Sequence, residues 1–328
     1  MTFRVTVSRP VPDAALALLR EAGLEVLGPG PSEGMAEADW TDRLARSEGL
    51  LCWLSDRVDA ARLAQAPCLR VVANYAVGVD NIDREAAGVR GIWVTNTPDV
   101  LTEATADLTL GLILACARRL VEADRFVREG RFAGWRSDLL LGTELAGKTL
   151  GLLGAGRIGS AVARRAAAFG MKILYNANSP KSDLERTCGA QRVAFPPLLS
   201  RSDVLSIHCP LSSETRGLIA RAELHRMKRT SILVNTARGA VVREADLVEA
   251  LRDGTIAAAG LDVFESEPAL SPGLCALPNA VLAPHIGSAT VETRDRMAVL
   301  AARNVIAVSR GEEPANAVVR GAVSPPPR

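Results

Sequence analysis

Histidine, aromatic residues and long apolar runs are all scarce in this chain of 328 residues. No run of about 18 apolar residues is free of charged residues, so the sequence predicts no helix that crosses a membrane. The start, MTFRVTVSRP, lacks the longer apolar core that a signal peptide requires. These absences favour a cytoplasmic protein.

An excess of charge of either sign is missing too, because 39 basic residues stand against 37 acidic ones. A net charge of +2 predicts no binding of nucleic acid or of an anionic membrane by the chain as a whole. Small anions are still allowed as partners. The six cysteines form no CxxC pair and no metal-ligand spacing, so we expect reduced structural thiols and no metal site.

Short apolar runs that alternate with helical patterns make up most of the chain, which predicts an α/β fold with parallel sheets. An apolar content of 48% can fill the cores of two domains. Expected strands are residues 3–7, 50–54, 69–73 and 92–95 in a first set, and 149–153, 172–175, 204–207, 231–234, 257–261 and 280–282 in a second. Between the sets, residues 102–128 predict one long helix. The proline-rich end, GAVSPPPR, is expected to be irregular and mobile.

A glycine-rich turn is the clearest single motif. Gly154, Gly156 and Gly159 form GxGxxG directly after the apolar run TLGLL and at the start of an alanine-rich helix. In this context the glycines permit a tight turn, a close approach of the backbone to a pyrophosphate, and packing of the helix against the strand. Backbone N–H groups at the helix start, around Arg157 and Ile158, then face the phosphates. The motif predicts a dinucleotide-binding Rossmann domain.

The choice between NAD and NADP depends on the end of the next strand. An acidic residue that would bind the ribose 2′-hydroxyl is absent from ILYNANSPK, which places Asn176 and Asn178 in that region. Without a carboxylate to repel a 2′-phosphate, Asn178, Ser179 and Lys181 are candidate partners for it, although the same residues also suit an ordinary polar turn. The sequence favours NADP over NAD.

Only three histidines are available for proton transfer near neutral pH. His225 lies in a charged helical segment and is expected on the solvated surface. His208 ends the apolar run LSIH and is interpreted as a structural residue near the cofactor. His285, in APHIGS, follows the last expected strand, where loops in parallel sheets line a ligand site. It is the best candidate for an acid–base group.

Five segments together resemble the D-isomer specific 2-hydroxyacid dehydrogenases, and most closely their glyoxylate and hydroxypyruvate reductase branch. They are VANYAVGVDNID, TPDVLTEATADL, VNTARG, GLDVFESEP and APHIGS, arranged around the GxGxxG helix. The resemblance implies two doubly wound domains. A Rossmann domain, residues 100–287, would be inserted in a flavodoxin-like substrate domain, residues 1–99 and 288–328, with hinge closure over the substrate.

The family pattern implies a catalytic triad of Arg238, Glu267 and His285. The glutamate that directly precedes the proline carries the role, so it falls to Glu267 and not to Glu265. In this interpretation His285 donates a proton to the carbonyl oxygen, and Glu267 orients its ring and favours its charged form. The guanidinium of Arg238 binds the substrate carboxylate in a fork geometry that lysine lacks.

Other roles also follow from the resemblance alone. Backbone N–H groups of Val77 and Gly78 are implied to bind the substrate, Asp262 to bind the nicotinamide carboxamide, and Trp135 to lie at a dimer interface or to close its own core. The cofactor-lining positions that the resemblance implies are Thr105, Pro210, Ala237, Asp262 and Gly287. They add to the cofactor positions derived above from the residues themselves, which are Gly154, Gly156, Arg157, Ile158, Gly159, Asn176, Asn178, Ser179 and Lys181.

The sequence therefore predicts a cytoplasmic, homodimeric oxidoreductase that uses NAD(P)H to reduce a short 2-oxo acid, such as glyoxylate or hydroxypyruvate, to the D-2-hydroxy acid. Two alternatives stay open. One is a nucleotide-sensing binding protein without turnover. The other is another 2-hydroxyacid or phosphite dehydrogenase of the same family, although the phosphite enzymes carry a lysine near the position of Val77, and the segment from Asn74 to Val77 has none.

Overall fold

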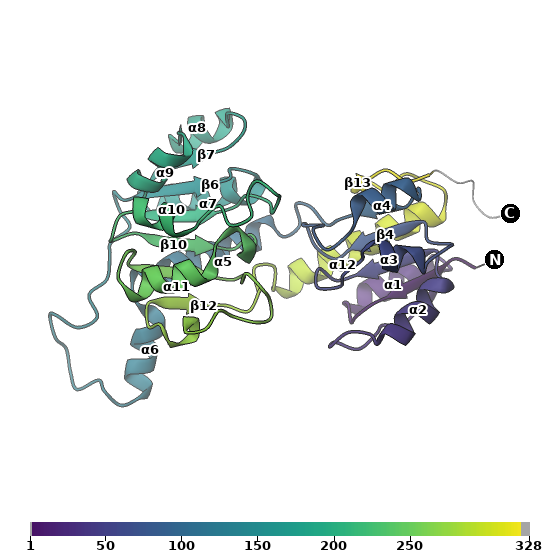
Figure 1. The fold of residues 1–328 in the computed structure, drawn as a ribbon, viewed down its shortest axis with the longest axis horizontal. Coiled ribbons are helices and arrows are strands. Elements are labelled where there is room, and N and C mark those ends of the chain that lie inside the picture. Colours follow the sequence, from purple (N-terminus) through teal and green to yellow (C-terminus); the bar gives the residue numbers. More distant parts are fainter. Residues whose placement is uncertain (1, 323–328) are drawn as a thin grey trace. The chain divides into compact units, whose positions relative to one another are not determined.

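The computed structural model describes residues 2–322 and divides the chain into two compact units. One unit comprises the residues up to Leu101 together with those from Ala289 on. The other comprises Thr102–Ser288. Figure 1 shows the course of the chain through both.

The first unit contains a six-stranded sheet with the order β13-β5-β4-β3-β1-β2. Five strands are parallel in the flavodoxin-like order 2-1-3-4-5, and β13 adds an antiparallel edge beside β5. The strands are β1 (Arg4–Val7), β2 (Glu25–Leu27), β3 (Gly49–Cys52), β4 (Val71–Asn74), β5 (Trp93–Thr95) and β13 (Ala317–Val319).

Helices cover both faces of this sheet because its central strands are apolar on both sides. All four residues of β3 and of β4 are buried. Helix α12 packs on these two strands and against α1, and the side chain of Thr290 caps its start by accepting the Thr293 N–H at 3.2 Å. The helices are α1 (Asp13–Glu21), α2 (Glu37–Ala45), α3 (Ala60–Ala64), α4 (Arg84–Val89) and α12 (Val291–Ser309).

The second unit contains a seven-stranded parallel sheet with the order β12-β11-β10-β9-β6-β7-β8. Chain order reverses at β6, so the glycine-rich turn after β6 lies at the switch point of a Rossmann sheet. The predicted α/β fold with a Rossmann unit and a flavodoxin-like unit is confirmed. The strands are β6 (Thr149–Leu153), β7 (Lys172–Asn176), β8 (Gln191–Arg192), β9 (Val204–Ile207), β10 (Ile232–Asn235), β11 (Ala258–Leu261) and β12 (Ala280–Leu282).

Two apolar cores, one on each face of this sheet, hold its helices in place. Helices α5 and α7 pack together on one face, and α9, α10 and α11 follow one another on the other. The helices are α5 (Thr102–Ala117), α6 (Leu120–Arg128), α7 (Arg157–Ala168), α8 (Ser182–Cys188), α9 (Phe195–Arg201), α10 (Arg221–Arg226) and α11 (Glu244–Arg252), with 3₁₀ turns η1 (Gly239–Val241) and η2 (Leu274–Ala276).

The prediction of one helix over residues 102–128 is wrong, because α5 ends at Ala117 and α6 begins at Leu120. Arg119 between them has a left-handed backbone with φ of +52°. The N–H of Thr143 donates to the Ala117 carbonyl at 2.7 Å, so a distant loop satisfies the end of α5. The chain then turns, and in Figure 1 α6 and the loop after it extend away from the sheet of their own unit.

Within residues 2–322, no helix is long and apolar enough to cross a membrane, and no group of acidic, cysteine or histidine side chains could hold a metal ion. The expected mobile end begins inside this range, where the Ala322 N–H donates to the Gly91 carbonyl at 2.9 Å. Its remaining residues, from 323 on, lie outside the described part.

Candidate active site

Three neighbouring parallel strands end at the candidate site. Strand β10 lies between β9 and β11, and β11 lies between β10 and β12. Arg238 follows β10, Glu267 lies in the loop after β11, and His285 follows β12. Since the carboxyl ends of parallel strands share one edge of a sheet, this topology alone gathers loops that are far apart in sequence.

Glu267 and His285 form a hydrogen-bonded pair. The distance between Nδ1 of His285 and Oε2 of Glu267 is 2.8 Å, across 18 positions of sequence. The second carboxylate oxygen of Glu267 accepts the Phe264 N–H at 3.0 Å, which fixes the carboxylate within its own loop. Both side chains are partly exposed, at 27% for His285 and 32% for Glu267, so a small molecule can reach the ring.

The environment of Glu267 keeps its carboxylate charged. Burial raises the pKa of Glu267, but the hydrogen bond and charge of His285, the Phe264 N–H and the charge of Arg238 together outweigh burial and bring the pKa below its ordinary value. A negative carboxylate beside the ring stabilises a protonated imidazole. Glu267 therefore presents a charged carboxylate to Nδ1 of the His285 ring.

Arg238 sits in a turn that Asn235 fixes. The side chain of Asn235, 1% exposed at the end of β10, donates to the Arg238 carbonyl at 2.9 Å and accepts the Ala237 N–H at 3.0 Å. The next residue, Gly239, lies against the Glu267 loop: a Cβ there would be 1.9 Å from the carbonyl carbon of Phe264. Only glycine allows this backbone contact, which brings the arginine turn and the Glu267 loop together.

Asp262 binds the backbone of the two residues that follow His285. Its carboxylate, almost fully buried, accepts the N–H of Ile286 at 2.7 Å and the N–H of Gly287 at 2.8 Å. Burial raises the pKa of Asp262 despite these two amides and the charge of His285. His285 itself has φ of +55°, a left-handed conformation that is uncommon for a non-glycine residue. The contact with the nicotinamide implied for Asp262 stays a prediction.

The other two histidines lack the surroundings of His285. Nε2 of His208 lies 2.8 Å from Oγ of Ser206, and burial lowers the pKa of His208 to about 4, so its ring is neutral near pH 7. His225 is exposed on α10. These positions agree with the interpretation of His208 as structural and of His225 as a surface residue.

The glycine motif has the geometry that a pyrophosphate needs. Gly154 has φ of +95°, and a Cβ there would lie 2.7 Å from the backbone of His208. A Cβ on Gly159 would lie 2.4 Å from the Gly154 carbonyl oxygen, so the third glycine permits the packing of α7 on the turn. By contrast, nothing lies within 4 Å of a Cβ on Gly156, where space is open for a ligand. The residues therefore fit a dinucleotide. Arg157 and Ile158 open α7 beside this space.

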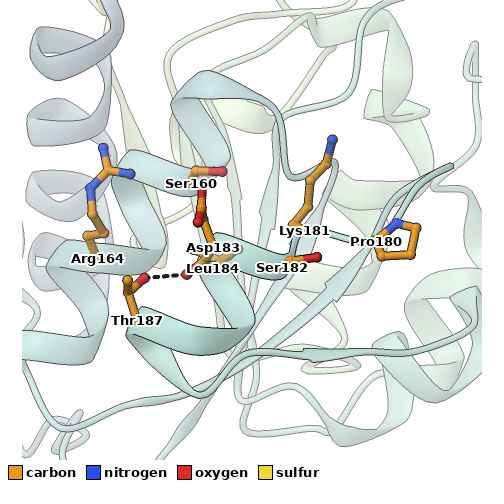
Figure 2. A pocket seen from close by; sticks show the side chains of 8 residues that line it. All are labelled: Ser160, Arg164, Pro180, Lys181, Ser182, Asp183, Leu184 and Thr187. Carbon is orange, nitrogen blue, oxygen red and sulfur yellow. Dashed lines mark hydrogen bonds between the residues drawn. The ribbon is translucent and has the colours of Figure 1, made fainter.

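The loop after β7 borders a cavity of about 440 Å³ between α7 and α8. Figure 2 shows its lining, in which Ser160 and Arg164 come from α7, and Pro180, Lys181, Ser182, Asp183, Leu184 and Thr187 from the loop and α8. Asn178 and Ser179 are exposed just before it, and Nζ of Lys181 lies 3.3 Å from Oγ of Ser179. Asn176 instead donates to the Val193 carbonyl at 2.9 Å.

The remaining predicted residues lie in five separate places. Thr105 meets Gly287, where a Cβ would lie 3.3 Å from the Thr105 methyl group, and Ala237 lies in the arginine turn. Pro210 follows β9 and its carbonyl accepts the Thr215 hydroxyl at 2.7 Å. Val77 and Gly78 belong to the other unit. There the side chain of Asn96 donates to the Val77 carbonyl at 2.8 Å, and that of Asn74 donates to the Gly78 carbonyl at 2.7 Å. Trp135 is 85% exposed in the loop after α6.

Sequence reasoning missed three polar residues that hold the loops of the site. Asn235 fixes the arginine turn, Glu244 binds the Glu267 loop, and Arg192 donates to the carbonyls of Ala177 and Asn178 in the loop after β7. Only Asn235 carried a signal, as an amide at the end of a buried apolar run. The partners of Glu244 and Arg192 are backbone groups far along the chain, which no local pattern reveals.

A Rossmann sheet with a glycine-rich pyrophosphate turn, and a carboxylate-bound histidine at the ends of its strands, defines a nicotinamide-dependent dehydrogenase. Residues 110–287 match the family model of the NAD binding domain of D-isomer specific 2-hydroxyacid dehydrogenases. A glyoxylate reductase of Aeropyrum pernix is 52% identical over 98% of this chain and 97% of its own length. One of Thermococcus litoralis is 46% identical over both full lengths. The chain belongs to the D-isomer specific 2-hydroxyacid dehydrogenase family.

Solved structures agree with this assignment. A Thermus thermophilus protein with 50% identity has a TM-score of 0.91 over 97% of this chain and 100% of its own. An NADPH-dependent glyoxylate/hydroxypyruvate reductase of Sinorhizobium meliloti, solved with NADP and malonate, is 35% identical with a TM-score of 0.84 over 100% and 99%. The chain is thus an NAD(P)-dependent oxidoreductase.

Proposed function

We propose that the protein reduces a short 2-oxo acid, with glyoxylate and hydroxypyruvate as the first candidates, to the D-2-hydroxy acid. The observation that carries this proposal is the hydrogen bond between His285 and Glu267 at the strand ends of a nicotinamide-binding domain. The names of the relatives, glyoxylate reductases at 46% to 52% identity, support the substrate class.

Arg238, His285 and Glu267 each have a separate role in the proposed reaction. Arg238 binds the substrate carboxylate through its planar guanidinium and polarises the adjacent carbonyl group. His285 donates its proton to the carbonyl oxygen, and Glu267 orients the ring through Nδ1 and stabilises its charged form. The reduced nicotinamide, when bound, supplies the hydride that the carbonyl carbon accepts. The glycines at 154, 156 and 159 hold its pyrophosphate.

The unit that contains Val77 and Gly78 is proposed to be the substrate domain. The carbonyls of both residues are engaged by the side chains of Asn96 and Asn74, which orient the peptide groups of this loop. Their N–H groups are proposed as donors to the substrate carboxylate. Residues 100–287 are proposed as the cofactor domain, with Thr105, Pro210, Ala237, Asp262 and Gly287 on the nicotinamide side.

NADPH is proposed as the preferred cofactor. The loop after β7 carries no carboxylate that would repel a 2′-phosphate. Lys181 and Arg164 bring two positive charges to the cavity beside it, against the one carboxylate in its lining, that of Asp183, which pairs with Arg186 at 3.0 Å. Asn178 and Ser179 add exposed polar groups at the same place. Asn176 contributes to the shape of the loop through its bond to Val193.

A homodimer is proposed, with α6 and the loop after it as the contact. No residue of α6 is buried, and its apolar side chains Leu120, Val121 and Val127 are exposed, as are Phe132 and Trp135 in the loop. Light scattering should give twice the chain mass, and Val127→Asp should halve it. Val89→Asp, at an apolar residue of the other unit that is 86% exposed, is the matched control and should leave the mass unchanged.

A cytoplasmic location is proposed as well. Free thiols at all six cysteines agree with a reducing compartment of this kind.

The decisive experiment is a panel of 2-oxo acids, assayed with NADPH and NADH and reported as kcat/KM. Glyoxylate or hydroxypyruvate should give the highest values, and phosphite with oxidised cofactor should give none. His285→Gln should lower kcat by about 10²–10⁴-fold, the usual contribution of general acid catalysis, while cofactor affinity stays the same. Tight cofactor binding without turnover of any acid would refute the proposal and indicate a nucleotide-sensing role.

A further inference from the structure

Glu244 is a buried carboxylate at the first position of α11, only 3% exposed. One of its oxygens, Oε2, accepts the N–H of Glu265 at 2.9 Å, and the other accepts the N–H of Ser271. These two amides stand on either side of Glu267 along the chain. Glu244 therefore binds both ends of the loop that presents Glu267.

The contact is reciprocal. The side chain of Glu265 accepts the backbone N–H of Glu244 at 2.9 Å, so the start of α11 and the start of the loop hold each other. Burial of a carboxylate is costly unless charge-assisted hydrogen bonds compensate it, and here two backbone amides do so. Helix α11 is itself anchored, because Leu247, Val248 and Leu251 lie in the apolar core beneath the sheet.

The loop that Glu244 binds touches both other parts of the site. Its residue Phe264 donates to Glu267 through the backbone N–H, and its carbonyl carbon faces Gly239, next to Arg238. Glu267 in turn bonds to His285. A displacement of the loop would therefore change the distance between Glu267 and His285. Among the hydrogen bonds of the described residues, only those of the Glu244 side chain hold both ends of this loop.

We propose that Glu244 is a positioning residue for the reaction: its buried carboxylate fixes loop 264–271 so that Glu267 meets the ring of His285. The inference rests on the proposed function, in which that pair protonates the substrate. Glu244 is assigned no contact with substrate or cofactor, and it acts only through Glu267. Glu265 contributes from the other side by binding the first N–H of α11.

The test compares Glu244→Ala and Glu244→Gln with the unchanged protein in steady-state assays of glyoxylate reduction. Displacement of a catalytic group by about 1 Å can lower the rate by about 100-fold, so we expect kcat to fall by about 10- to 100-fold in the alanine variant. Glutamine keeps one acceptor oxygen and should lose less. The Kd of NADPH, measured by fluorescence, should stay the same, because the glycine turn lies elsewhere in the unit.

A double-mutant cycle with Glu267→Gln separates positioning from general structural damage. If Glu244 acts through Glu267, then Glu244→Ala should have little further effect on kcat once Glu267 has been changed. An equal fold-loss in both backgrounds would overturn the inference. Glu223→Gln is the matched control, since this carboxylate also accepts a backbone N–H near a helix start, from Ala220 at 3.2 Å, and should leave kcat unchanged.

The outcomes distinguish the two proposals. If Glu267→Gln lowers kcat but neither Glu244 variant does, the positioning role is wrong and the proposed function stands. If Glu267→Gln itself retains full kcat, the role of the histidine pair is wrong and the inference fails with it. Thermal unfolding of each variant shows whether it is folded at the assay temperature, and Glu244→Gln keeps the test valid if the alanine variant is not.

Discussion

The carboxylate of Asp262 binds the two backbone N–H groups that follow His285, those of Ile286 and Gly287, at 2.7 and 2.8 Å. The same residue accepts the His285 N–H through its carbonyl at 2.9 Å. Three hydrogen bonds from one residue thus surround His285, whose backbone has φ of +55°. A conformation of this kind costs of order 1–3 kcal/mol and persists only where neighbouring contacts impose it.

We therefore expect Asp262→Asn to impair catalysis. Asparagine offers one acceptor oxygen and turns its NH₂ group toward the second amide, which leaves a buried donor without a partner. The loop should relax, and kcat for glyoxylate reduction should fall by about tenfold or more. A crystal structure of the variant should show a changed φ at residue 285. Full kcat together with an unchanged loop would contradict this account.

The pKa of Glu267 predicts how stability depends on pH. A carboxyl group whose pKa is lowered on folding contributes stability above its unfolded pKa, here near the ordinary value of 4.5, and the contribution is lost as the pH falls through the lower, folded pKa. The difference in unfolding free energy between the unchanged protein and Glu267→Gln should shrink as the pH falls below about 4.5. Urea unfolding across this range measures it, and a difference that is independent of pH would count against the charged pair.

Gly239 is predicted to tolerate no side chain. In Gly239→Ala the new methyl group would lie 1.9 Å from Phe264, and the obstructing atoms are backbone, so the arginine turn must move away from the Glu267 loop. We expect a lower Tm and loss of nearly all activity. Gly111→Ala is the matched control, because this glycine is exposed on α5 with nothing within 4 Å of its Cβ, and alanine there should raise stability by about 1 kcal/mol.

Lys181 is predicted to select the cofactor. A charge-assisted hydrogen bond to a phosphate contributes about 1.5–3 kcal/mol, so Lys181→Ala should raise the KM for NADPH about tenfold or more and leave the KM for NADH unchanged. Lys172→Ala, at the exposed start of β7, removes the same charge from the opposite end of that strand. If both cofactors are affected equally, the cavity in Figure 2 does not receive the 2′-phosphate.

Strands with a clear apolar run could be predicted from sequence, and most of those at the sheet edges could not. The buried strands β6 and β9 have the predicted bounds, because an apolar run of four or five residues between turn signals is a strong pattern. Among the edge strands only β12, with the short apolar run Ala280–Leu282, was predicted. Edge strands β2, β8 and β13 are short and partly exposed, with no continuous apolar run. The break at Arg119 was equally hidden, since it depends on the bond between Thr143 and Ala117.

The same division holds in the site. Arg238, Glu267 and His285 were found through short motifs, and the structure brings two of them into hydrogen-bond contact. The carboxylates that hold their loops, Asp262 and Glu244, bind backbone amides that are more than 20 positions away. Contacts of this kind arise from tertiary folding, and the residue types at these positions do not specify them.

Strands β10, β11 and β12 lie side by side in fixed register, with Leu261 opposite both Asn235 and Leu282. A slip of one residue in either pairing would move the following loop by about 3.3 Å, more than any hydrogen bond in the site can absorb. A substitution deep in these strands that changed their register would therefore displace the site residues, although it lies far from any reacting atom. The backbone hydrogen bonds between these strands thus determine how accurately the three loops of the site are placed.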